Sequence, residues 1–191
     1  MLMRTRVLLL LLITFLPASV LAATPWEQYL DFPSAQNAKQ VHSLTYSKGA
    51  ASFGNYNGGD LQILALQVYA GDRESLRLAI RLKGQSDGGL AEDLTAIVGH
   101  VIRIHPQLFL EEIKFAKISI TGLEDIVLNA GLEYADRPEA NQYELNMRLE
   151  ALSRVNEKEL QVLRNTSIDA IKRESHLTLR SSGTGQKRPA P

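Results

Sequence analysis

The stretch HVIRIHP, residues 100–106, places two of the chain's four histidines close together. Paired histidines are typical of metal sites, but a pair on a helix must be three or four positions apart to share a face. His100 and His105 are five apart, which turns them about 140° from each other on a helix and puts them on opposite faces of a strand. Pro106 disfavours a helical conformation at His105. We therefore expect this stretch to end one helix and begin the next, without binding a metal.

Adjacent acidic residues are the next candidates for chemistry, because two carboxyl groups can act as a general acid and a general base. Such pairs occur at Glu92–Asp93, Glu111–Glu112 and Glu124–Asp125. Each pair falls in the first half of an expected helix, where the helix dipole favours negative charge. We expect solvated helix starts at these positions and no catalytic residues.

Several other kinds of site lack their defining residues. The chain has no cysteine, which removes disulfides, thiolate zinc sites and cysteine nucleophiles. It has no G-x-S-x-G motif, the turn that carries the nucleophile of many hydrolases. The glycine-rich stretches NYNGGD and SDGG lack the lysine and the hydroxyl residue of a phosphate loop. The sequence thus indicates no cofactor and no metal.

One glycine-rich stretch, YSKGAASFGNYNGG at 46–59, is the strongest candidate for binding a partner. It is the longest expected loop inside the chain, and loops of this length are commonly functional. Tyr46, Phe53 and Tyr56 are interleaved with the glycines, and aromatic residues are enriched in the cores of interfaces. The alternative is a flexible connection whose aromatic side chains pack onto the body of the protein.

The N-terminal residues 1–22 have the three-part plan of a signal peptide. Arg4 and Arg6 precede an apolar run over 7–16, and small residues then lead to an expected cleavage site after Ala22. The run is shorter than the roughly 20 residues that span a bilayer. We expect an exported protein, periplasmic or secreted, with no membrane span after cleavage because no second long apolar run follows.

The balance of charge argues against nucleic acid as a partner. The chain has 21 lysines and arginines and 21 acidic residues. Cleavage after Ala22 removes Arg4 and Arg6, which leaves 19 basic against 21 acidic residues. Binding to nucleic acid relies on a basic patch or stripe. We expect the partner to be another protein.

Apolar residues that recur at the helical period predict about eight helices. The clearest stripe contains Leu94, Ile97, Val98 and Val101. The expected helices cover residues 34–44, 60–70, 73–83, 87–105, 106–117, 121–130, 136–153 and 157–174. Only residues 116–121 alternate in the manner of a strand.

The ends of the chain differ from this helical region. Residues 23–57 are expected to form an N-terminal arm, the first helix and the glycine- and aromatic-rich loop. The arm should pack its aromatic residues over the first helices. Residues 176–191 have no apolar pattern, so a disordered tail is expected there.

The helices of residues 58–175 are spaced as two-helix units. Asp60, Asp87 and Thr121 each begin such a unit, 27 and 34 residues apart, close to the period of roughly 30–35 residues expected of helical-hairpin repeats. In this spacing the chain resembles the HEAT and armadillo-like class of helical repeat proteins. The resemblance implies an all-α array of helical hairpins, similar to an α-solenoid, in which each pair buries its apolar face on the next. An irregular helical bundle is the alternative architecture.

These observations together favour an exported, soluble helical-repeat protein that acts as a non-enzymatic protein-binding or scaffold module. One alternative is a periplasmic immunity or inhibitor protein against an exported toxin, which should concentrate acidic or aromatic residues on one surface. The other is an enzyme whose site is assembled from histidine and carboxylate groups on separate helices. An enzyme needs a deep pocket with converging polar groups.

Overall fold

The computed structural model describes residues 22–42, 58–131, 134 and 136–183. In these residues the prediction of an all-α chain is confirmed, since every regular element is helical and none is a strand. The elements are α1 (Pro25–Asp31), α2 (Ala35–Gln40), α3 (Gly58–Tyr69), α4 (Arg73–Lys83), α5 (Gly88–Ile104), α6 (Pro106–Ala116), α7 (Ile120–Leu128), α8 (Pro138–Ser153), the 3-10 helix η3 (Lys158–Leu160) and α9 (Gln161–Gly183).

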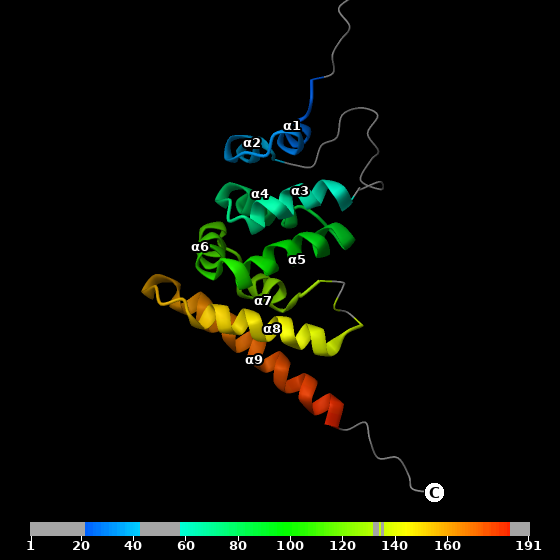
Figure 1. Ribbon diagram of the computed structural model, residues 1–191. Coiled ribbons are helices and arrows are strands. Elements are labelled where there is room, and N and C mark those ends of the chain that lie inside the picture. Colours follow the sequence, from blue (N-terminus) through cyan, green and yellow to red (C-terminus); the bar gives the residue numbers. More distant parts are fainter. Residues whose placement is uncertain (1–21, 43–57, 132–133, 135, 184–191) are drawn as a thin grey trace, which may run out of the picture.

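The helices are stacked along the length of the molecule (Figure 1). Sequential helices pack as pairs in α1 with α2, α3 with α4, and α5 with α6, while α7 and α8 each pack on α5 and on α9, which lies at the other end of the stack. Contacts run from α2 to α4, from α4 to α6 and from α6 to α8. A second series of contacts runs from α1 to α3, α5, α7 and α9 in turn. Helices α1 to α6 therefore pack in sequential pairs and on the adjacent pairs, whereas α7 and α8 are held together through their shared contacts with α5 and α9.

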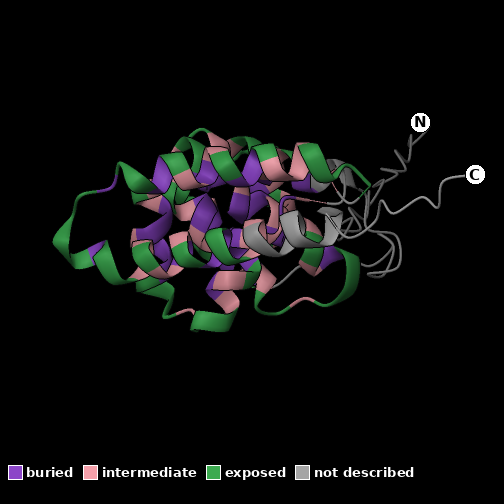
Figure 2. Ribbon diagram, turned by 90° about the horizontal axis from the view of Figure 1, so that it is seen from below, coloured by how far each residue is buried: buried purple, intermediate pink, exposed green. Residues whose placement is uncertain are grey.

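The apolar core lies along the inside of this stack, as the buried residues in Figure 2 show. All nine α-helices of the described chain contribute to it. Leu94, Ile97, Val98 and Val101 are buried, so the stripe predicted on α5 is confirmed. Asp72 caps α4, since its Oδ1 accepts from the Ser75 backbone N–H at 2.7 Å.

The strand pattern at 116–121 does not form a strand. Lys117 ends α6 in the left-handed conformation, with φ of 53°. Ser119 then caps α7 by accepting from the Gly122 backbone N–H, so this helix begins before Thr121. The alternation is short, and the left-handed Lys117 and the Ser119 cap join α6 to α7 within it.

The N-terminal arm contains a helix that the apolar pattern did not predict. Thr24 and Glu27 form a reciprocal capping box at the start of α1. Trp26 and Tyr29 are buried, and the Tyr29 hydroxyl lies 2.8 Å from the Ser75 hydroxyl of α4. The expected packing of the arm is therefore found for these two residues, whereas Phe32 is 74% exposed.

The last helix extends beyond the boundary expected at residue 175, because α9 continues to Gly183. The part of the tail placed at 176–183 is thus helical. No glycine or proline interrupts the chain between residue 175 and Gly183, so nothing in this segment breaks the helix. Within the described chain, no helix combines the length and apolar character needed to cross a membrane.

Candidate functional site

The stretch with His100 and His105 ends one helix and leads into the next, as predicted. α5 ends at Ile104, and His105 joins it to α6. The His105 Nε2 lies 3.1 Å from the Tyr69 carbonyl oxygen at the end of α3. The His100 ring instead packs on the Tyr69 ring, with centroids 4.8 Å apart, and its Nδ1 is 4.0 Å from Glu144 Oε1. The described residues contain no cluster of three or more potential ligands that could hold a metal ion.

Next to His100, α8 carries a buried ion pair that was not predicted from the sequence. Glu144 and Arg148 are both buried, and Arg148 Nε donates to Glu144 Oε1 at 3.1 Å. Arg148 Nη1 also donates to three carbonyl oxygens at the end of α7, at 3.0–3.3 Å from Ile126, Val127 and Asn129. The last carbonyls of a helix have no partner within the helix, so this guanidinium supplies the missing donor.

Glu144 and Arg148 each favour the charged form of the other, which opposes the effect of burial on their pKa values. Burial alone raises the pKa of Glu144, but the charge and hydrogen bond of Arg148, together with Arg103 and His100, lower it overall. Arg103 Nη1 donates to the other carboxylate oxygen at 3.1 Å. Burial also lowers the pKa of Arg148, and Glu144 opposes that shift. A carboxylate held ionised by such contacts is a structural group and is poorly suited to act as a general acid.

A second charged cluster joins α4 to α6 and corrects one expectation. Glu112 lies in the middle of α6 and is buried, so the Glu111–Glu112 pair is not a solvated helix start. Arg73 and Arg77 of α4 both bind the Glu112 carboxylate, and Arg77 Nε donates to Oε2 at 2.6 Å. The remaining ion pairs of the cluster join Arg73 to Glu111, Arg77 to Glu74 and Lys39 to Glu74. The other two acidic pairs have at least one exposed member each, Glu92 and Asp125.

Beside this cluster is a groove between α4 and α6, called here the α4–α6 groove. Its cavity measures about 370 Å³. The residues lining it are Arg77, Ile80, Arg81, Gly84, Gln85, Glu112, Phe115, Ala116 and Ile118. Phe115 is 65% exposed although it is a large apolar side chain. The Arg77 guanidinium carbon lies 4.2 Å from the centre of the Phe115 ring, which is a cation–π contact.

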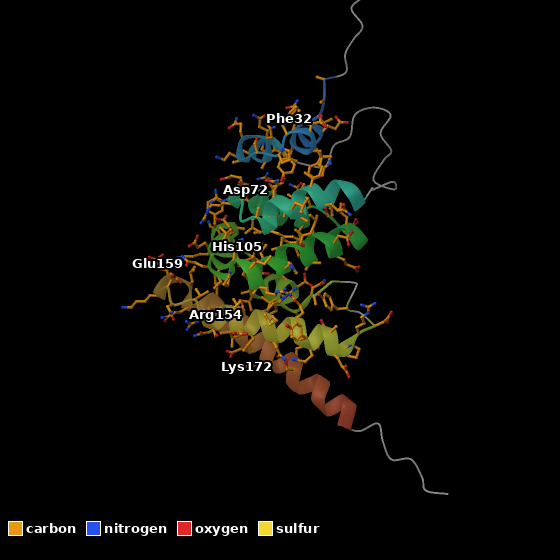
Figure 3. All side chains as sticks on the ribbon, in the orientation of Figure 1. Phe32, Asp72, His105, Arg154, Glu159 and Lys172 are labelled. Atoms are coloured by element: carbon orange, nitrogen blue, oxygen red, sulfur yellow. The ribbon has the colours of Figure 1, made fainter. Side chains whose placement is uncertain are left out.

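Two further hollows adjoin the other side of α6, next to the turn between α8 and α9. One of about 480 Å³ lies among Arg73, His105, Glu111 and Arg154. The other, of about 410 Å³, lies between Lys114 and η3. Figure 3 shows that His105, Arg154 and Glu159 lie along the same edge of the stack. These hollows are lined mainly by polar and charged residues, which distinguishes them from the α4–α6 groove.

The residues predicted to bind a partner, Tyr46, Phe53 and Tyr56, lie outside the described residues. Phe115 was not singled out from the sequence, although a signal was present. The buried positions of α6 include Phe109, Leu110 and Ile113. Phe115 lies two positions after the last of them, where the helical period places a residue away from the core.

No protein-family model matches this chain, and no curated protein and no solved structure matches it either. The class of protein is therefore defined by the fold and its surface alone. The described part of the chain is all-helical, with an exposed aromatic residue in a groove between α4 and α6.

Proposed function

We propose that this is an exported, non-enzymatic protein-binding module that binds its partner at the α4–α6 groove. The observation that carries the proposal is the exposed Phe115 ring held beside Arg77. Arginine and aromatic residues are enriched in the cores of protein interfaces. In a monomer without a partner, the same ring would leave apolar surface in contact with water.

The fixed position of Arg77 supports the proposal. Its guanidinium is bound to the buried Glu112 and to Glu74, so its orientation is set before any partner arrives. Ordering a long side chain on binding opposes association by about 0.5–1.5 kcal/mol. Because Arg77 and Phe115 are in contact before a partner binds, part of this unfavourable free energy of ordering is avoided.

The arrangement of the helices supports the helical-repeat form of this proposal. Two series of contacts, one through α2, α4, α6 and α8 and one through the remaining helices, are what stacked hairpins of the HEAT or armadillo-like class would produce. Such arrays present extended surfaces to partners. An irregular bundle remains the alternative architecture, and the longer α9 and the 3-10 turn before it favour irregularity at that end.

Cross-linking from position 115 tests the binding proposal. A photoreactive phenylalanine derivative placed at Phe115 should form a covalent adduct with one partner protein in the native cells. The same residue placed at Val162, which is 77% exposed on α9, is the matched control and should not form it. Equal cross-linking from both positions, or none from Phe115, would contradict the proposal.

Substituting the same residue gives a quantitative prediction. Phe115→Ala should weaken binding of the cross-linked partner at least tenfold, equivalent to about 1.4 kcal/mol. Because the ring is largely exposed, the free energy of unfolding should change by about 1 kcal/mol or less. Isothermal titration and urea denaturation measure the two effects. A Phe115→Ala variant that binds as tightly as the parent would rule out the groove as the contact surface.

The export part of the proposal has a separate test. If residues 1–22 are a signal peptide, mass spectrometry of the native protein should find a mature N-terminus near Ala23. The basic residues Arg4 and Arg6 before the apolar run motivate this expectation. A protein that retains Met1 and stays in the membrane fraction would refute cleavage and leave the binding proposal intact.

A further inference from the structure

We propose that the α4–α6 groove takes an acidic amphipathic helix of the partner, with its apolar side chains on Phe115 and its carboxylates toward Arg81 and Lys117. The inference rests on the proposed function, because it names the chemistry of the partner at the same site. It is based on the balance of charge along the groove and on the apolar residues at its centre.

The charged cluster at one side of the groove is internally balanced. Three cations, Lys39, Arg73 and Arg77, are paired with three carboxylates, Glu74, Glu111 and Glu112. The Glu112 carboxylate accepts from both arginines, and Oε1 also receives a longer bond from Arg77 Nη2 at 3.3 Å. This cluster therefore fixes the geometry of the groove without giving it a net charge.

The unbalanced charges are Arg81 and Lys117. Arg81 Nη2 donates to the carbonyl oxygens of Ala38 and Val41, at 3.1 and 2.6 Å, and its buried Nε has no hydrogen-bond partner. No ion pair joins Arg81 or Lys117 to a carboxylate of the described chain. Lys117 is exposed where α6 ends, next to Ile118 of the groove.

Two helix ends oppose this positive charge but do not cancel it. α4 ends at Lys83 and α6 at Ala116, beside the groove residues Gly84 and Ile118. The C-terminus of a helix carries about half a negative charge, so two of them offset about one of the two cations. About one positive charge is left at this end of the groove, and it favours a carboxylate.

The middle of the groove suits apolar side chains. Ile80, Phe115 and Ile118 line it, and its volume of about 370 Å³ falls in the range of about 300–1,000 Å³ of clefts that enclose ligands. A groove between two helices commonly receives the apolar face of a third, with anchor residues three or four positions apart. Acidic residues on the flank of such a helix would reach Arg81 and Lys117.

Selection from a displayed library of random peptides on the purified protein tests the inference without knowledge of the partner. Enriched peptides should carry apolar residues at helical spacing and a net negative charge. Their affinity should fall about tenfold for Phe115→Ala and at least threefold for Lys117→Gln and Arg81→Gln. Replacing the acidic residues of the peptide by their amides should have a similar effect, and raising the salt concentration should weaken binding.

Lys172→Gln is the matched control, because Lys172 is an exposed lysine on α9, far from α4 in Figure 3. It should leave peptide affinity unchanged. Lys117→Gln changes only an exposed side chain, so it keeps the test valid if Arg81→Gln disturbs the docking of α2. The inference is overturned if no peptide is enriched, if the enriched peptides are neutral or basic, or if Lys117→Gln and Lys172→Gln have the same effect. Cross-linking from Phe115 would still succeed in those cases if the partner binds the groove by other chemistry.

Discussion

Replacing Arg148 with methionine should lower the free energy of unfolding by about 3–5 kcal/mol, the range found when one partner of a buried ion pair is removed. Methionine fills a similar volume but leaves the Glu144 carboxylate in a site with only 1% of its surface exposed. The carbonyls of Ile126, Val127 and Asn129 also lose their donor. In a chain of this size, such a loss corresponds to a fall in Tm of about 10 °C.

The C-terminal end of α8 provides a matched control, because Arg154 is the residue that caps it. Arg154 pairs with Glu150 at the same i, i+4 spacing as Arg148 and Glu144, but both members of that pair are exposed. Exposed pairs of this spacing contribute about 0.3–0.5 kcal/mol. Arg154→Met should therefore change the urea midpoint only slightly. If the two methionine variants are equally destabilised, burial is not what makes the Arg148 pair important.

The pH dependence of stability should also differ between the parent and Arg148→Met. In the parent, the folded-state pKa of Glu144 is below its ordinary value of 4.5, so its contribution is complete above that value and is lost as pH falls through the lowered pKa. In Arg148→Met, the charge and hydrogen bond of Arg148 no longer lower the pKa of Glu144, so burial raises that pKa. Protonation then relieves a buried charge, so the stability difference between the two proteins should narrow on acidification. Urea denaturation between about pH 7 and pH 3 measures this difference, and a gap that widens at low pH would contradict the account.

The helices could be predicted from the sequence because their information is local. The stripe of α5 and the Asp72 cap of α4 depend on residues within one or two turns. The same local rules could have revealed α1, since Thr24 and Glu27 match a capping box with proline at the first helical position. The apolar pattern alone missed it because the helix has only seven residues.

The charged clusters could not be predicted because their partners are far apart in the sequence. Glu112 of α6 meets Arg73 and Arg77, which precede it by 39 and 35 residues. An acidic residue in the middle of a helix is usually solvated, so nothing near Glu112 indicated its burial. The Glu144–Arg148 spacing is likewise common on exposed helix surfaces, and Arg154 with Glu150 shows the same spacing in solvent.

Substitution of Gly99 by alanine should destabilise the protein by about 2–3 kcal/mol, the sum of overpacking and lost hydrogen bonds less the gain in helix propensity. A Cβ at this position of α5 would lie 2.7 Å from the Ile126 carbonyl oxygen and 2.9 Å from Arg148 Nη1. Neither group can move freely, because one is backbone and the other is the buried guanidinium that holds the end of α7. Glycine is therefore required for α5 and α7 to approach each other here.

Gly89 of the same helix provides the control with the opposite sign. A Cβ there would meet nothing within 4 Å, so Gly89→Ala should gain up to about 1 kcal/mol from helix propensity. Because the Cβ at Gly99 would crowd the Arg148 guanidinium as well as the Ile126 carbonyl, the double variant Gly99→Ala with Arg148→Met should lose less stability than the two single losses added together. Thermal denaturation of the four proteins gives the coupling. If the losses simply add, the alanine acts through backbone crowding alone, and the guanidinium is not the group that requires glycine at this position.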